Sequence, residues 1–129
     1  MKLLLDTHIW LWSLGEPEKL SERVLRELRN HDNELWLSPI SLWETLLLHA
    51  KGRIFLAPDL RQWTTEASSQ LREAPLTHEI VFAAHRLPLA HLDPADRFLV
   101  ATADVLGLTL VTSDERLLGL GSIATLANR

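Results

Sequence analysis

Cysteine is absent from this 129-residue chain, and its absence removes several kinds of site at once. Without a thiol there is no disulfide framework, no thiolate ligand for a metal and no cysteine nucleophile. A chain without cysteine fits a reducing compartment, so we expect a cytoplasmic protein.

Long apolar runs are also missing. No stretch approaches the roughly 20 apolar residues that span a membrane, so we expect no membrane association. The first run, Lys2 to Leu5, is too short for the apolar part of a secretion signal and stops at Asp6. This run therefore indicates a strand of the core.

Positive charge is in deficit, with 17 acidic residues against 13 basic ones and a net charge of −4. Proteins that coat nucleic acid nonspecifically are basic, so the global charge argues against that class. It does not exclude a nuclease, because metal-binding carboxylates contribute negative charge themselves. Length and composition, with 47% hydrophobic residues, fit one globular domain over residues 1–129.

Short apolar runs alternate with helical patterns, and no repeat or linker interrupts them. We expect strands at 2–5, 34–38 and 108–113, a less marked one at 123–126, and a brief extended piece before 78. Helical spacing predicts helices at 7–14, 18–29, 40–51, 60–71, 78–87 and 94–106, and a last turn at 115–118. Strands separated by helices indicate parallel pairing and an α/β layer sandwich.

Two aspartates follow expected strands directly. Asp6 ends the first run and Asp114 ends the "LTLVTS" run, so in a parallel sheet both would emerge at the edge where ligands bind. Asp96 falls in the first turn of the helix that "DPADRF" begins, and Glu44 lies in the "ISLWE" helix. We expect these four acids to gather at one end of the sheet.

Each acid also has a purely structural interpretation. Asp6 can cap the helix that starts at Thr7, and Asp114 can cap the last turn. In "DPAD", Asp93 is placed as the cap before Pro94, and this role explains Asp93 fully. Asp96 falls in the first turn, where its negative charge interacts favourably with the helix dipole. Glu44 shares a helical stripe with other polar residues that would suit a solvated face: Ser41, Thr45 and His49.

Carboxylates that converge repel one another unless a cation lies among them. Oxygen ligands suit Mg²⁺ or Mn²⁺, which we therefore expect as the cofactor. The histidines offer no competing zinc site, because no two stand at the spacing of a tight pair, and most are expected at the surface or as caps. His8 is of interest because it stands beside Asp6; the others are His31, His49, His78, His85 and His91.

Four motifs carry a resemblance to a known family. They are "LLLDTHIWLW", "LSPISLWE", "HLDPADRFLVATA" and "LVTSDERL", in this order and over almost the whole chain. In order and spacing they resemble the PIN-domain ribonucleases, most closely the VapC-type toxins of bacterial toxin–antitoxin pairs. The resemblance implies a PIN-like three-layer sandwich, with a central, mainly parallel sheet flanked by helices.

The resemblance also implies a site and an activity. The catalytic, metal-binding set would be the four acids, and the supporting residues would be Thr7, Ser41, Thr112 and Arg97. Arg97 is expected to pair with a surface group or brace a carboxylate rather than act in catalysis. The implied activity is Mg²⁺-dependent endoribonuclease cleavage by metal-activated water. The implied partners are an RNA substrate, a VapB-type antitoxin that neutralises the toxin, and a second copy in a homodimer.

RNA would have to be held by local cations despite the negative net charge, although each of these is more ordinarily a solvated surface residue. The candidates are Arg23, Arg26, Arg29, Lys51, Arg53, Arg86 and Arg116. Five tryptophans, among them Trp10, Trp12 and Trp43, are expected in the core or an interface rather than as base-stacking platforms.

Two alternatives remain open. An aspartate-based phosphotransfer or phosphatase domain also places an acid at a strand end, but a phosphatase needs D-x-D, and here His8 occupies the second position. A receiver domain needs a lysine after a late strand, which "LVTSDE" lacks. A non-catalytic PIN-like binding module is the other alternative, and the intact acids argue against it.

Overall fold

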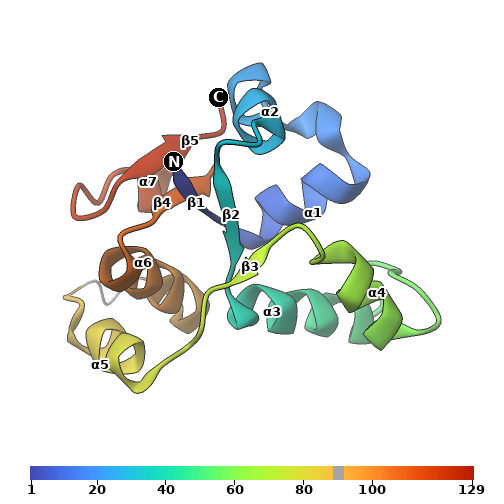
Figure 1. Ribbon diagram of the computed structural model, residues 1–129. Coiled ribbons are helices and arrows are strands. Elements are labelled where there is room, and N and C mark those ends of the chain that lie inside the picture. Colours follow the sequence, from blue (N-terminus) through green and yellow to red (C-terminus); the bar gives the residue numbers. More distant parts are fainter. Residues whose placement is uncertain (89–91) are drawn as a thin grey trace.

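The computed structural model describes residues 1–88 and 92–129, in which the strands form one five-stranded sheet. Helices lie on both sides of this sheet (Figure 1). The strands follow the order β3-β2-β1-β4-β5, and every neighbouring pair is parallel. Their bounds are Lys2–Leu5 (β1), Glu34–Leu37 (β2), Arg72–Glu73 (β3), Thr109–Thr112 (β4) and Thr125–Ala127 (β5). The predicted mainly parallel α/β fold is confirmed.

The described helices connect these strands as crossovers or lie at their ends. Their bounds are Thr7–Gly15 (α1), Glu22–Arg29 (α2), Pro39–Ala50 (α3), Leu60–Ala67 (α4), His78–Arg86 (α5), Pro94–Leu106 (α6) and Glu115–Leu118 (α7), with a 3₁₀ turn at Pro17–Lys19. None of the described helices is long and apolar enough to cross a membrane.

Successive side chains of β1 point to opposite faces of the sheet, and this divides the core into two layers. Leu3 and Leu5 pack on one face with Ile9 and Trp10 of α1, in the same cluster as residues of α2 and α4. Leu4 points to the other face, where it joins the buried leucines and valine of α6 and α7. Figure 1 shows the result: α1, α2 and α4 lie on one side of the strands, and α5 and α6 on the other.

The expected helix at 18–29 is wrong in its first part. The chain forms a 3₁₀ turn, leaves helical geometry at Leu20 and Ser21, and starts α2 at Glu22. Ser21 has extended backbone angles, and its side chain accepts a hydrogen bond from the Val24 N–H. This cap fixes the true start of the helix.

Other element bounds also differ from those predicted. Helix α4 ends at Ala67 rather than at 71. Directly after this end, the Ser68 hydroxyl donates a hydrogen bond to the Thr64 carbonyl and competes with continuation of the helix. Strand β3 forms at Arg72–Glu73, slightly before the expected extended piece, and β5 at Thr125–Ala127 rather than at 123–126. His91, expected as a surface or cap residue, lies outside the described residues.

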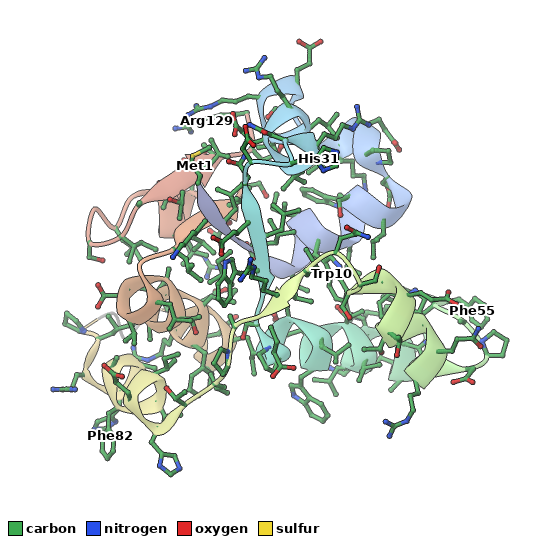
Figure 2. All side chains as sticks on the ribbon, in the orientation of Figure 1. Met1, Trp10, His31, Phe55, Phe82 and Arg129 are labelled. Carbon is green, nitrogen blue, oxygen red and sulfur yellow. The ribbon has the colours of Figure 1, made fainter. Side chains whose placement is uncertain are left out.

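The tryptophans divide between core and surface. Trp10 is 1% exposed and packs against Trp63 with ring centroids 5.5 Å apart. Trp43, in contrast, is 57% exposed, so it is not part of the core, and the interface position also predicted for it stays a prediction. Figure 2 shows Trp10 within the molecule and Phe55 and Phe82 at its periphery.

Candidate functional site

All four predicted acids line one cavity of about 360 Å³. Asp6 follows β1 and caps α1, and Asp114 follows β4 and caps α7. Asp96 comes from the first turn of α6, and Glu44 from α3. Because the strands are parallel, these segments meet at the carboxyl edge of the sheet, as predicted. The cavity is also lined by Thr7, His8, Leu47, Leu48, Lys51, Arg53, Asp93, Ser113 and Arg116.

Both carboxylate oxygens of Asp6 are held in place. The backbone N–H of Thr7 donates to Oδ1 at 2.8 Å, and the buried hydroxyl of Thr112 donates to Oδ2 at 2.6 Å. Burial raises the pKa of Asp6, while these two hydrogen bonds act to lower it. Asp6 therefore caps α1 and also lines the cavity, and its role as a metal ligand stays a prediction.

A chain of hydroxyls reaches Glu44 from the protein interior. The Thr7 hydroxyl donates to Oε1 of Glu44 at 2.6 Å and lies 3.0 Å from the hydroxyl of Ser41. Because a carboxylate can only accept, the single proton of Thr7 goes to Glu44, and Ser41 donates to Thr7. Ser41 and Thr45 are fully buried, so the solvated-face interpretation of this stripe is wrong.

Asp96 is the acid whose protonation is most strongly shifted. Burial, followed by the negative charges of Asp93, Asp6 and Asp114, raises its pKa from 3.8 to about 7. The nearby guanidinium of Arg116 acts in the opposite direction. The raised pKa means that the charged form of Asp96 lacks sufficient favourable partners. A cation bound beside Asp96 would stabilise that charged form.

Asp114 has the opposite environment because Arg116 pairs with it. Arg116 Nε donates to Oδ1 of Asp114 at 3.2 Å, and one terminal nitrogen donates to Oδ2 at 2.8 Å. These hydrogen bonds lower the pKa of Asp114. The same terminal nitrogen lies 3.4 Å from Oδ2 of Asp96, so Arg116 bridges two of the four acids.

The supporting residues divide into two groups. Thr7, Ser41 and Thr112 contact the acids or one another, as predicted. Arg97 instead donates to backbone carbonyls at the end of α5, at 2.8 Å to Ala84, 3.3 Å to His85 and 2.8 Å to Leu87. These contacts place Arg97 at the junction of α5 and α6.

Sequence reasoning treated two cavity residues incompletely. Asp93 was assigned to capping alone; it does cap α6, but it also lines the cavity. Arg116 was considered only as a candidate RNA-binding cation, whereas it pairs with the acids. Its position two residues after Asp114 was the available signal. Of the other candidate cations, Lys51 and Arg53 line the cavity.

The donor set suits a hard divalent cation. The four acids supply only carboxylate oxygens, the ligands that Mg²⁺ and Mn²⁺ prefer, and their mutual repulsion favours a cation among them. Within residues 1–88 and 92–129, no three acidic or histidine side chains are already gathered closely enough to hold an ion.

Comparison with known proteins identifies the family. The PIN domain family matches residues 3–121, which is most of the chain. A curated relative, ribonuclease VapC22 of Mycobacterium tuberculosis, is 35% identical over 116 residues, which cover 89% of this chain and 88% of the relative. The chain therefore belongs to the PIN-domain family, rather than to the phosphotransfer enzymes that a strand-end aspartate also suggested.

Solved structures share the fold at lower identity. VapBC2 of Rickettsia felis, bound to a promoter DNA fragment, matches with a TM-score of 0.75 and 17% identity over 98% of both chains. DNA-bound VapBC of Salmonella typhimurium matches with a TM-score of 0.74 and 19% identity, over 100% of this chain and 99% of the other. At this identity they establish the PIN-like fold alone.

Proposed function

We propose that this protein is a divalent-metal-dependent endoribonuclease, the toxin of a VapBC-type toxin–antitoxin pair. The observation that carries the proposal is the convergence of Asp6, Glu44, Asp96 and Asp114, from four separate segments, on one cavity. The family match and the 35% identity to a ribonuclease support the same activity. The intact acids at this cavity argue against a non-catalytic PIN-like binding module.

The acids would hold Mg²⁺ or Mn²⁺ against a phosphodiester of the RNA. When bound, such an ion lowers the pKa of a coordinated water and neutralises charge that develops on the phosphate. Asp6 would be a well-oriented ligand, because each of its carboxylate oxygens accepts a hydrogen bond. Glu44 is oriented by Thr7 and could hold either the ion or the attacking water.

Local cations would offset the negative charge of the protein toward RNA. Lys51 and Arg53 are exposed and line the cavity beside the acids. Among the residues that the structure describes, neither of them forms an ion pair with an acid. They therefore remain available to pair with the phosphates that flank the cleaved bond.

Partners follow from the same proposal. The structural relatives from Rickettsia felis and Salmonella typhimurium were solved as VapBC assemblies, which supports a VapB-type antitoxin as the neutralising partner here. We also propose that the protein forms a homodimer. We propose a cytoplasmic location, where RNA is accessible and where reducing conditions do not affect a chain without cysteine.

Cleavage of a mixed RNA pool by the purified protein tests the proposal. Wild type should cleave with Mg²⁺ or Mn²⁺ and stop in EDTA, and Asp6→Asn and Asp96→Asn should be inactive although folded. Asp104→Asn is the matched control, because Asp104 is an exposed acid on α6. Activity that persists in EDTA, or in both acid variants, would show that another group or a contaminant cleaves the RNA.

A further inference from the structure

Arg116 occupies a position that an incoming cation would need. Its terminal nitrogen donates to Oδ2 of Asp114 at 2.8 Å and lies 3.4 Å from Oδ2 of Asp96. The two acids belong to different segments, one following β4 and the other in α6. The guanidinium is thus the positive group between them in the described structure.

An ion shared by Asp96 and Asp114 through these Oδ2 atoms would need the position that Arg116 occupies. Mg²⁺ holds carboxylate oxygens at about 2.0–2.1 Å, so two acids that share an ion converge on one point. The terminal nitrogen of Arg116 already stands between the oxygens that would converge. The metal ion and the guanidinium of Arg116 cannot occupy this space together, because their atoms would overlap and their positive charges would repel each other.

Arg116 differs from the other cations of the cavity in this respect. Lys51 and Arg53 also line the cavity, but among the described residues only Arg116 forms an ion pair with the site acids. Its side chain is 55% exposed, so it can leave the acids without losing a buried environment. An exposed ion pair is weak enough for a divalent ion to displace.

We propose that Arg116 is a built-in competitor of the divalent ion. In the metal-free protein it pairs with Asp114 and lies against Asp96, and the ion must displace it to assemble the site. This inference rests on the proposed function, since it concerns the same acids. Arg116 therefore sets the metal concentration at which the site assembles, in addition to any contact it makes with RNA.

Direct measurement of Mn²⁺ binding tests the inference without relying on cleavage. Free Mn²⁺ is counted by electron paramagnetic resonance during titration of wild type, Arg116→Gln and Arg129→Gln, at mildly alkaline pH so that the acids are ionised. Arg116→Gln should bind Mn²⁺ roughly two- to fivefold more tightly, the range expected for losing a competing exposed ion pair. Arg129→Gln should match wild type, because Arg129 pairs with Glu115 outside the cavity.

A second measurement follows the displacement itself in wild-type protein. Phenylglyoxal modifies free guanidinium groups, and peptide mass spectrometry reports the extent at each arginine. Mn²⁺ should increase modification of Arg116 and leave Arg129 unchanged. If Mn²⁺ does not change the modification of Arg116, or protects it, then Arg116 stays on its acids and the inference is overturned.

The outcomes separate this inference from the proposed function. If Mn²⁺ binds wild type and is lost in Asp6→Asn, but Arg116→Gln binds no more tightly, only the competition is disproved. If Asp6→Asn binds Mn²⁺ as well as wild type does, the acids are not the metal site, and the proposed function fails along with the inference.

Discussion

The hydroxyl of Thr112 donates to Oδ2 of Asp6 at 2.6 Å, which joins two residues 106 positions apart in the chain. The contact follows from strand register, because Leu5 of β1 pairs with Val111 of β4 and the next residues lie side by side. The same hydroxyl accepts a hydrogen bond from the backbone N–H of Asp114 at 3.0 Å. One buried threonine therefore fixes two acids of the site.

Thr112→Val should weaken both the fold and the site. The change keeps the shape but leaves the Asp114 N–H and an oxygen of Asp6 without this partner, which should cost about 1–3 kcal/mol in the free energy of unfolding. The pKa of Asp6 should rise further, so Mn²⁺ binding at neutral pH should weaken. Urea unfolding and Mn²⁺ titration check this. Thr112→Ser retains the hydroxyl and should stay near wild type; equal Mn²⁺ affinity in the valine variant would contradict the prediction.

Thr7→Val should reduce RNA cleavage by about ten- to hundredfold, because Glu44 loses the hydroxyl that orients it. Thr7→Ser should restore most of the activity. Thr45→Val is the matched control: Thr45 is equally buried, but its hydroxyl donates to the Ser41 carbonyl within α3. Initial cleavage rates at saturating metal separate the two threonines. If Thr45→Val lost as much activity as Thr7→Val, general disruption of the packing between α1 and α3 would explain both.

The raised pKa of Asp96 predicts a pH dependence of stability in the metal-free protein. The folded pKa is about 7 against 3.8 for the ordinary group, so the folded state binds this proton more tightly than the unfolded state. The resulting stability is fully present below about pH 4 and is lost as pH rises through about 7. Burial also raises the pKa of Asp6, which adds a contribution of the same sign.

Urea unfolding in EDTA at about pH 5 and about pH 8 measures this contribution. Wild type should lose stability toward the higher pH, and Asp96→Asn should lose less, because its amide does not titrate. Asp104→Asn should retain the wild-type slope. The assignment to Asp96 would be refuted by an Asp96→Asn variant with an unchanged slope.

Arg97→Gln should destabilise the junction of α5 and α6 by about 1–3 kcal/mol, since it removes charged hydrogen bonds to helix-terminal carbonyls. Arg86→Gln, which removes an exposed cation from the same end of α5, should stay within about 0.5 kcal/mol of wild type. Thermal or urea unfolding measures both. Comparable losses in the two variants would point to helix charge rather than to the carbonyl contacts.

Much of the fold could be predicted because local signals were strong. The Asp93-Pro94 start of α6 and its end at Gly107, which has a φ of 66°, follow from backbone preferences within a few residues. Strand-end positions placed Asp6 and Asp114 at one edge once parallel pairing was inferred. In contrast, β3 consists of the exposed, charged pair Arg72–Glu73 and exists only through its pairing with β2, so no local pattern marks it.

Side-chain partners depend on distant packing and were harder to predict. The contact between Thr7 and Glu44 requires α1 and α3 to lie together, although each residue was singled out separately. The bridge that Arg116 forms depends on where α6 holds Asp96 relative to the start of α7. Sequence alone identified these residues as candidates, but it could not determine their partners.

The central position of β1 has a consequence for synthesis of the protein. Strands β2 and β3 extend the sheet on one side of β1, and β4 and β5 extend it on the other. In chain order, Asp6 and Glu44 precede α6 and leave the ribosome before Asp96 and Asp114 do. A nascent chain halted before α6 carries only half of the acids. The four acids can gather at one cavity only after Asp114 has been synthesised.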